Sequence, residues 1–253
     1  MIYLGEVAAK LVEVTPVRPN PCVYLSGGID SSVTLHCLRQ KFSGHIDAYT
    51  AMFGNDDDDK KELDRARRIA ELYNCRWTAV PVGPVIERLG ELLQHFDRPR
   101  YNLWPVYLAE QASRDQCQSA YIGEGGDEMF GYGDRSYHEG WAGHLEWVVP
   151  TYETLNRLGG METVMPFRNL PWQHMLDLWH PKKKYLRAAF RGLIPDWILD
   201  KPATPPRFTL YQRTWANEFP GLPVPSDAEI KVEFQRLATE AWLKTRTPVV
   251  QEA

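Results

Sequence analysis

The sequence predicts an α/β protein with a parallel, doubly wound sheet. Short apolar runs rich in β-branched and aromatic residues alternate with stretches of helical spacing, and this alternation is typical of parallel sheets covered by helices on both faces. Two of the apolar runs end abruptly at glycine-rich turns. Since ligands of such folds bind at the carboxyl ends of the strands, we expect the functional site at these turns.

The expected elements alternate along the first 122 residues. In chain order they are a helix over 7–14, a strand over 22–25, a helix opened by 25–32, a strand over 46–53, a helix over 59–74, a strand over 76–82, a helix over 107–117 and a strand over 120–122. The acids at 56–59 lie at the positive end of the dipole of the helix that they precede. Near the C-terminus, Ile230, Phe234, Leu237 and Ala241 form one apolar helical stripe, which we expect to serve packing only.

Length and proline content divide the chain. Its 253 residues correspond to one large or two modest domains at about 150 residues each. Of 19 prolines, 12 lie from Pro150 onward, which favours short helices joined by turns in that part. We therefore expect an α/β domain over 1–150 and a helical region over 151–253.

Composition excludes several classes of protein. Lys and Arg total 29 against 33 Asp and Glu, for a net charge of -4, which disfavours a general binder of nucleic acid. No stretch is apolar enough to cross a bilayer, and Glu6 and Lys10 lie where a signal peptide needs its apolar core, so we expect a cytoplasmic protein without a membrane partner. The four cysteines form no CxxC pair and the histidines show no ligand spacing, so we expect reduced thiols and no transition metal.

The segment LeuSerGlyGlyIleAspSerSer (25–32) has the features of a phosphate-binding loop. Gly27 and Gly28 allow a tight turn and close approach of a ligand, and the hydroxyls of Ser26, Ser31 and Ser32 are expected to point, with the free helix amides, at one place. Neither GxxxxGK[ST] nor GxGxxG is present, which disfavours an ordinary NTPase or a dinucleotide oxidoreductase. A simple turn from strand to helix is the alternative.

Asp30 adds a carboxylate to this loop. An aspartate among phosphate-binding donors repels the ligand unless a cation lies between them. The loop therefore predicts a Mg²⁺ ion together with the phosphate.

Four motifs resemble one known family. SerGlyGlyIleAspSerSer (26–32) resembles the pyrophosphate loop of the ATP-pyrophosphatase, or PP-loop, superfamily. GlyGluGlyGlyAspGluMetPheGlyTyr (123–132) is similar to GEGxDELFGGY of the asparagine synthetase synthetase domain, 160–167 to its GxExRxPF, and LysLysTyrLeuArg (183–187) to its KxxLR. All four follow the order of the family over residues 5–210. The resemblance implies an adenine nucleotide alpha hydrolase-like fold of the HUP type.

The resemblance also implies a reaction and its cofactors. A substrate carboxylate would attack the α-phosphate of ATP with Mg²⁺ present, giving an acyl-adenylate and pyrophosphate, and an amine or ammonia would then displace AMP to form an amide. Residues 1–150 would be the PP-loop ATP-binding domain, and the helical region 151–253 would complete the synthetase site. The partners would be a small carboxylate and an amine.

Matching the motifs residue by residue gives each group a role. Asp30 and Asp127 would hold Mg²⁺, Lys183 would neutralise pyrophosphate or the α-phosphate, and Glu124 would contact the second substrate and orient the amine. The residues expected to bind ATP are Leu25, Ser26, Gly27, Gly28, Asp30, Ser31, Ser32, Met52, Gly123 and Arg187. Without the motifs, a solvated loop acid or a helix cap is the preferred interpretation of Glu124. Lys183 is flanked by Lys182 and Lys184, and a basic solvated turn is an equal alternative for any one of the three.

The chain departs from the family in two respects. Ile2 stands where the family has the cysteine nucleophile of its glutaminase, so we expect no glutaminase here and a nitrogen supplied by free ammonia, another amine or a separate glutaminase partner. Val164 replaces the arginine of GxExRxPF, and Asn169 replaces an aspartate that usually follows it. Both changes fall on the acceptor side and put aspartate as the substrate in doubt.

Two other classes of protein compete with an amide ligase. One is a different PP-loop adenylating enzyme that modifies a nucleobase or a natural-product intermediate, although its thiolating branches usually need the paired cysteines missing here. The other is a non-catalytic module that has kept the fold. Asp30, Glu124, Asp127 and Lys183 argue against it, because packing alone does not need these charges at strand ends.

Overall fold

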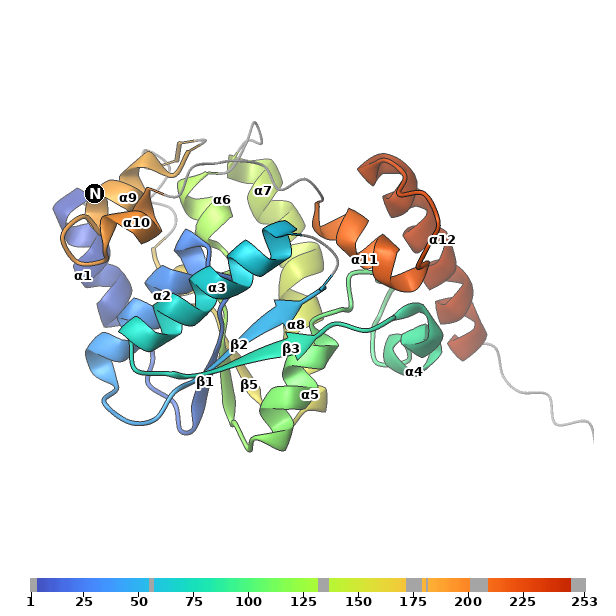
Figure 1. The fold of residues 1–253 in the computed structure, drawn as a ribbon, viewed down its shortest axis with the longest axis horizontal. Coiled ribbons are helices and arrows are strands. Elements are labelled where there is room, and N and C mark those ends of the chain that lie inside the picture. The colour runs from blue at the N-terminus through green and yellow to red at the C-terminus, as the bar shows by residue number, and fades with distance from the viewer. Residues whose placement is uncertain are drawn as a thin grey trace, which may run out of the picture.

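The computed structural model describes residues 4–54, 57–131, 137–171, 179–180, 182–200 and 209–246. Its centre is a five-stranded sheet in the order β3-β2-β1-β4-β5, with every neighbouring pair parallel. The strands are β1 (Pro21–Tyr24), β2 (Asp47–Met52), β3 (Arg76–Pro81), β4 (Ser119–Tyr121) and β5 (Glu162–Val164). The first four confirm the strands expected from the sequence, and the doubly wound parallel sheet is confirmed with them (Figure 1).

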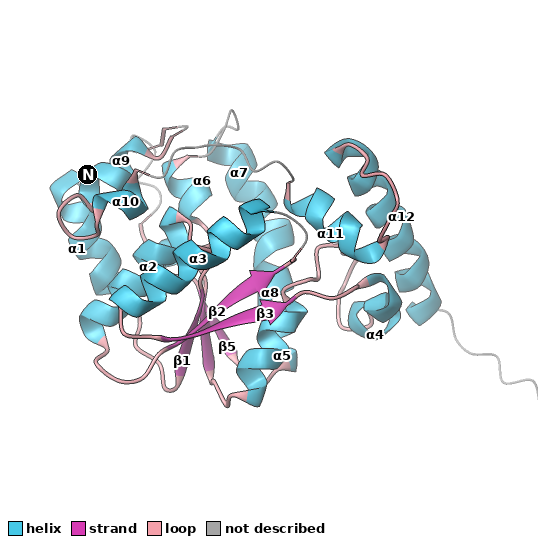
Figure 2. Ribbon diagram, in the orientation of Figure 1, coloured by secondary structure: helices cyan, strands magenta, loops and turns pink. Residues whose placement is uncertain are grey.

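Helices surround the sheet, as the cyan and magenta ribbons of Figure 2 show. The longer ones are α1 (Leu4–Val14), α2 (Ile29–Lys41), α3 (Asp57–Leu72), α5 (Val106–Arg114), α8 (Val149–Leu158), α11 (Leu210–Glu218) and α12 (Asp227–Arg246). The shorter ones are α4 (Leu89–Leu93), α6 (Gly126–Phe130), α7 (Tyr137–Gly143), α9 (Lys184–Ala189) and α10 (Asp196–Leu199), with 3₁₀ turns at Ile86–Arg88 and Pro166–Asn169 and a π-helical turn at His144–Val148. None of the described helices has both the length and the apolar character that a bilayer crossing requires.

Two apolar cores lie on opposite faces of the sheet. One packs α1, α2, α3 and α9 against the sheet through fully buried residues such as Leu11, Leu35 and Ile69. The other packs α5 and α8 against it through Leu108, Ala112 and Val149. Helices on both faces leave the carboxyl edge of the strands as the place where a ligand can enter.

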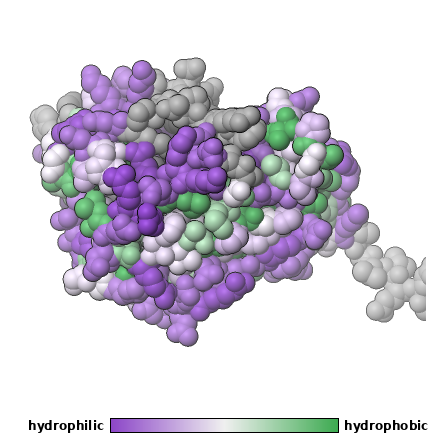
Figure 3. Space-filling view, viewed as in Figure 1, coloured by the Kyte–Doolittle hydropathy of each residue, from purple (hydrophilic) through white to green (hydrophobic). Residues whose placement is uncertain are grey.

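A third apolar cluster joins the end of the chain to the body. α12 packs on α4 and on the segment before α5, with Ala238 fully buried. Of the expected stripe, Ile230 and Phe234 are buried, and Leu237 and Ala241 pack against this cluster, which agrees with a packing role. In Figure 1, α11 and α12 form a separate part beside β3. Hydrophilic residues cover most of the face in Figure 3, and hydrophobic ones show mainly in its middle and on this part.

The sheet extends past the expected boundary at residue 150. β5 pairs with β4 through Ala120 and Thr163, so a strand lies in the region 151–253 that was expected to be helical. The sequence analysis missed β5 because three residues are too few to show an alternating pattern. The division into two domains stays a prediction.

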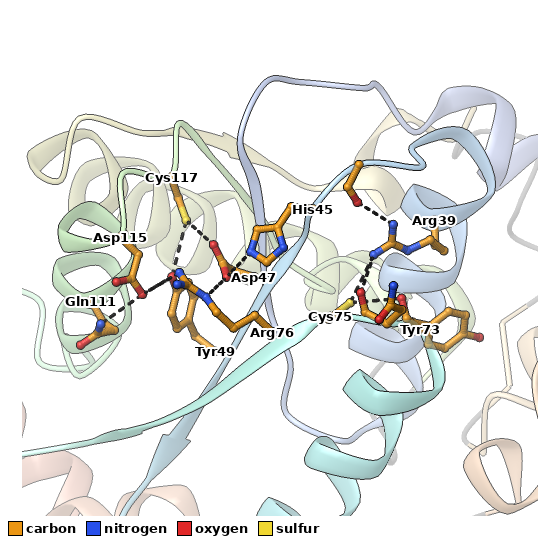
Figure 4. A network of polar contacts seen from close by, with 12 residues as sticks. Arg39, His45, Asp47, Tyr49, Tyr73, Cys75, Arg76, Gln111, Asp115 and Cys117 are labelled. Atoms are coloured by element: carbon orange, nitrogen blue, oxygen red, sulfur yellow. Dashed lines mark hydrogen bonds and ion pairs between the residues drawn. The ribbon is translucent and has the colours of Figure 1, made fainter.

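The amino edge of the sheet holds a polar network, drawn in Figure 4. The buried carboxylate of Asp47 accepts a hydrogen bond from Arg76 Nε at 2.6 Å and lies 3.0 Å from His45 Nε2. Tyr49 donates to Asp115 at 2.7 Å. These contacts tie β2, β3 and the turn before β4 together at the edge opposite the carboxyl ends. All four cysteines are free, as expected.

Candidate active site

The loop after β1 requires glycine at its centre. Gly27 has φ +74°, a conformation that side chains with a Cβ rarely adopt, and a Cβ there would lie 3.2 Å from the carbonyl oxygen of Glu62. The chain then enters α2 at Ile29, after Gly28. The loop therefore packs closely against α3. The amides that begin the 13-residue helix α2 face the carboxyl edge of the sheet.

The three serines of the loop have different surroundings. Ser31 Oγ and Ser32 Oγ both donate to the carbonyl of Gly28, at 3.2 and 2.7 Å, and Ser31 Oγ also accepts from the amide of Ser26 at 3.2 Å. Ser26 Oγ accepts from the amide of Gly28 at 3.3 Å and lies 3.1 Å from Ser31 Oγ. All three hydroxyls therefore brace the loop, whereas they were expected to point at a ligand. Ser26 is exposed and is the serine best placed to reach a phosphate.

The loop after β4 meets the loop after β1 because β1 and β4 are neighbours. A Cβ on Gly126 would lie 2.5 Å from Asp30 Oδ1, so glycine leaves room for that carboxylate. Gly125 has φ +95° and forms the N-cap of α6, whose first turn carries Asp127. The glycines of both motifs therefore bring Asp30 and Asp127 to one place.

Lys183 joins these two carboxylates. Its Nζ contacts Asp30 Oδ2 and Asp127 Oδ1, and the residue is only 6% exposed. Burial opposes the charge of the lysine, but the two carboxylates outweigh it and hold the pKa of Lys183 above its usual value. Burial raises the pKa of Asp30 to about 6, against the opposing effect of Lys183.

The same carboxylates fit a Mg²⁺ ion. Asp30 Oδ1 is buried and has no hydrogen-bond partner among the described residues, which suits an oxygen that coordinates a cation. Within the described ranges, no three His, Cys, Asp or Glu side chains are arranged as a metal site. Mg²⁺ in proteins is often held by one or two carboxylates, water and substrate phosphates, so Asp30 and Asp127 suffice if ATP supplies the rest.

Glu124 lies deeper on the same loop, beside a tyrosine of α8. Its carboxyl group interacts with the hydroxyl of Tyr152, and burial together with the neighbouring carboxylates raises the pKa of Glu124 to about 8. Behind it, Glu128 Oε2 lies 3.6 Å from Nδ1 of His144. Burial lowers the pKa of His144 to about 4, so this histidine is neutral at physiological pH.

A cleft of about 390 Å³ opens at the carboxyl ends of β1, β2 and β4. Its walls are formed by residues of the two loops, of β2, of α3, α5 and α8, and of α11. They are Tyr24, Leu25, Ser26, Asp30, Ser31, Tyr49, Thr50, Ala51, Phe53, Asp59, Glu62, Trp104, Leu108, Ile122, Gly123, Glu124, Gly125, Asp127, Tyr152, Leu210 and Arg213. The cleft lies where a doubly wound sheet is expected to bind its ligand.

Most residues expected to act at the site surround this cleft. Those that line it are Leu25, Ser26, Asp30, Ser31, Gly123, Glu124 and Asp127. Lys183 reaches it through Asp30 and Asp127, and Gly27, Gly28 and Ser32 form the loop behind it. Met52 and Arg187 are not among the lining residues; Arg187 Nε donates to the carbonyl of Lys182 at 2.9 Å instead. Their roles toward ATP stay predictions.

Several lining residues were missed by the sequence analysis. Thr50 Oγ1 donates to the carbonyl of Leu25 at 2.7 Å and ties β2 to the phosphate loop. Trp104 lies edge to face with Phe53, with ring centres 5.8 Å apart. Arg213 of α11 is buried and lies 2.6 Å from Glu62 Oε2. No motif marks any of them.

The sheet, the glycine-rich loop at the start of α2 and the carboxylate pair with its lysine define a nucleotide-binding α/β protein. A family model described as "Asparagine synthase" matches residues 17–167, and the chain belongs to that family. Membership supports an ATP-using enzyme of the ligase type. The match ends before Lys183, whose place at the site therefore rests on the structure, and it is shorter than the 5–210 spanned by the motifs.

Solved structures similar to this chain are distant. An NH3-dependent NAD synthetase from Campylobacter jejuni is 12% identical with 100% of both chains covered and a TM-score of 0.43. An NMN synthetase from Francisella tularensis is 15% identical with 99% of both chains covered and a TM-score of 0.43. A U34-tRNA thiolase from Methanococcus maripaludis is 14% identical, with 93% of this chain and 78% of that one covered and a TM-score of 0.42. A search of curated proteins finds no match.

Proposed function

We propose that the protein is an ATP-dependent, AMP-forming amide ligase of the asparagine synthetase type. A carboxylate oxygen of the substrate attacks the α-phosphorus of ATP, the bond to the β-phosphate breaks, and pyrophosphate leaves. An amine or ammonia then attacks the acyl carbon of the acyl-adenylate, AMP leaves, and the nitrogen loses a proton. The observation that carries the proposal is the meeting of the phosphate loop, Asp30, Asp127 and Lys183 at one cleft.

The phosphate side of the cleft is suited to the first step. The amides at the start of α2 and the exposed hydroxyl of Ser26 are donors for the triphosphate. The buried ammonium of Lys183 is a preorganised cation beside the place where negative charge develops on the leaving pyrophosphate. Asp30 and Asp127 would hold Mg²⁺, which supplies charge neutralisation of the phosphates when it is bound.

The opposite side of the cleft is suited to the second step. Glu124 is a carboxyl group with a pKa raised to about 8 by burial and neighbouring acids, and a group with a pKa near the working pH is effective in general acid–base catalysis. Once deprotonated, it can accept a proton from the attacking amine, and Tyr152 lies beside it in the same cleft. We assign Glu124 to this proton transfer and to orienting the amine.

The substrates proposed are small molecules, with the nitrogen coming from ammonia, another amine or a separate glutaminase. The test is a screen in which the purified protein, ATP and Mg²⁺ are incubated with carboxylic acids, each with ammonia or with a primary amine. Pyrophosphate and AMP released in equal amounts, and only with a suitable carboxylate, are expected. ADP with inorganic phosphate, or no pyrophosphate with any pair, would contradict the proposal.

The same screen separates the alternative within the superfamily. An enzyme that adenylates a nucleobase or a natural-product intermediate would release pyrophosphate only when RNA, DNA or that intermediate is added. Including total tRNA and duplex DNA as additional substrates distinguishes the two reactions. Release that depends on nucleic acid and not on a carboxylate would favour the alternative.

A further inference from the structure

The two carboxylates proposed for Mg²⁺ already share a cation in this structure. Lys183 Nζ contacts an oxygen of Asp30 and an oxygen of Asp127. The lysine is 6% exposed, and its flanking residues Lys182 and Lys184 are exposed. One member of the basic turn is therefore selected and placed inside the site.

The backbone around Lys183 fixes this placement. Lys183 has φ +51°, which is uncommon for a residue with a side chain. Its amide donates to the carbonyl of His180 at 2.8 Å, and its carbonyl accepts from the amide of Arg187 at 3.0 Å, at the start of α9. A conformation of this kind persists only where the surroundings determine it, so the inward position of Lys183 is built into the fold.

We propose that Lys183 and Mg²⁺ exclude each other at the Asp30–Asp127 pair, so that the lysine neutralises the pair in the free protein and withdraws from it when the metal binds. The inference rests on the proposed function for its assignment of Mg²⁺ to these two residues. A divalent ion and an ammonium group in contact with the same two carboxylates would place three positive charges against two negative ones, and like charges a few ångströms apart repel each other, most strongly around the buried Lys183.

The two oxygens of Asp30 suggest how the exchange begins. Oδ2 contacts Lys183, whereas Oδ1 is buried, lies beside the Cα of Gly126 and has no hydrogen-bond partner among the described residues. A metal ion can therefore gain its first protein ligand at Oδ1 while the lysine still contacts Oδ2. The ammonium group of Lys183 is then released from the carboxylates and becomes available to the phosphates. Binding of the metal would in this way also position Lys183.

The first test is a titration with Mn²⁺, used as a spectroscopic substitute for Mg²⁺, in the absence of ATP. Free Mn²⁺ is measured by electron paramagnetic resonance for the wild type, for Lys183→Met and for the matched control Lys184→Met. Because the competing ammonium is removed, Lys183→Met is expected to bind Mn²⁺ on the order of tenfold more tightly or better, and Lys184→Met to equal the wild type. Equal or weaker affinity in Lys183→Met overturns the exclusion.

The second test uses the wild-type protein, so it stands even if Lys183→Met does not fold. A small amine-reactive reagent is applied with and without saturating Mg²⁺, and modification of each lysine is read by mass spectrometry. Labelling of Lys183 is expected to rise several-fold with the metal while that of Lys184 stays constant. Labelling of Lys183 that is unchanged or reduced overturns the proposal.

Both tests are independent of catalysis. They use no ATP, carboxylate or amine, so exclusion can be found even when no pyrophosphate is released in the substrate screen. Conversely, release of pyrophosphate without a change in Mn²⁺ affinity or in labelling would support the proposed function and contradict the exclusion between Lys183 and the metal.

Discussion

Gly123, which follows β4, and Ser31, in the first turn of α2, approach each other through their backbones. A Cβ on Gly123 would lie 2.6 Å from the amide nitrogen of Ser31 and 2.7 Å from the carbonyl carbon of Asp30. Backbone atoms at such a distance cannot move away from an added Cβ as the end of a flexible side chain can. This contact sets the spacing between the two motif loops, and with it the distance between Asp30 and Asp127.

Gly123→Ala is therefore expected to push the start of α2 away from the loop after β4. Overpacking of this kind costs about 1 to 3 kcal/mol of stability, and we expect weaker ATP binding because the phosphate-binding amides move with the helix. Urea unfolding measures the first effect and calorimetric titration with ATP the second.

Gly90→Ala is the matched control for this substitution. Gly90 lies in α4 with open space where its Cβ would be, so alanine is expected to be neutral or to stabilise by up to about 1 kcal/mol. If Gly123→Ala unfolded within about 0.5 kcal/mol of the wild type, a range usual for surface substitutions, the close approach would not constrain the site.

Asp127→Asn tests the carboxylate pair. The substitution keeps the shape of the side chain and removes one charge, so we expect the rate of pyrophosphate release to fall on the order of a hundredfold or more. The melting temperature should change little, because Asp127 is partly exposed. Asp64→Asn, which removes an exposed acid of α3 paired with Arg67, is the control. An unchanged rate in Asp127→Asn would remove Asp127 from the metal site.

The sequence was sufficient to predict four of the five strands of the sheet and the meeting of the two motif loops. Each of the first four strands is followed or preceded by a turn of recognisable composition, and parallel strands joined by helices present their carboxyl ends at one edge. The glycines of both loops are local signals, because their conformation and the closeness of their neighbours exclude other residues. Asp30 was predicted from its place in the first loop, and Glu124 and Asp127 from the resemblance of the second loop to the family motif.

Contacts between distant segments could not be predicted in this way. The pairing of Arg213 with Glu62 joins residues 151 positions apart, and nothing in the local pattern of α11 marks Arg213. The choice among three consecutive lysines depends on the backbone conformation of Lys183, which residue type does not determine. These residues come close to one another only in the folded chain, so their roles could not be predicted from local sequence patterns.

Glu124→Gln is expected to change the pH dependence of stability. In the folded protein the pKa of Glu124 is about 8, above its ordinary value of 4.5. The folded state therefore holds this proton more tightly than the unfolded chain, and the contribution of Glu124 is full below about pH 4.5 and is lost as the pH rises through 8. The variant has no such proton to lose, so ligand-free Glu124→Gln should be more stable than the wild type by several kcal/mol near pH 9.

Thermal unfolding of both proteins across this pH range, in the presence of a chelator, measures the difference. Below about pH 4.5 the two curves should converge, because Glu124 is then protonated in both the folded and unfolded states. Glu128, whose pKa burial raises to about 7, remains in both proteins, so its titration contributes to both curves. Parallel curves over the whole range would show that Glu124 is not held protonated by the fold.

Arg213→Met tests whether the helices near the C-terminus belong to the site. Arg213 is 5% exposed, lines the cleft and lies 2.6 Å from Glu62 and 3.9 Å from Asp59. Methionine replaces much of the stem but leaves the carboxylate of Glu62 without this guanidinium, so we expect a loss of about 1 to 3 kcal/mol together with a higher KM for ATP.

A double-mutant cycle with Glu62→Gln isolates the pair itself. We expect a coupling energy of about 1 to 2 kcal/mol, within the range for residues in direct contact, whereas the exposed pair of Arg236 and Glu233 on α12 should give less than about 1 kcal/mol. A coupling energy near zero would mean that the contact between Arg213 and Glu62 does not hold α11 against the cleft. A large coupling and a raised KM together would make α11 a functional wall of the cleft.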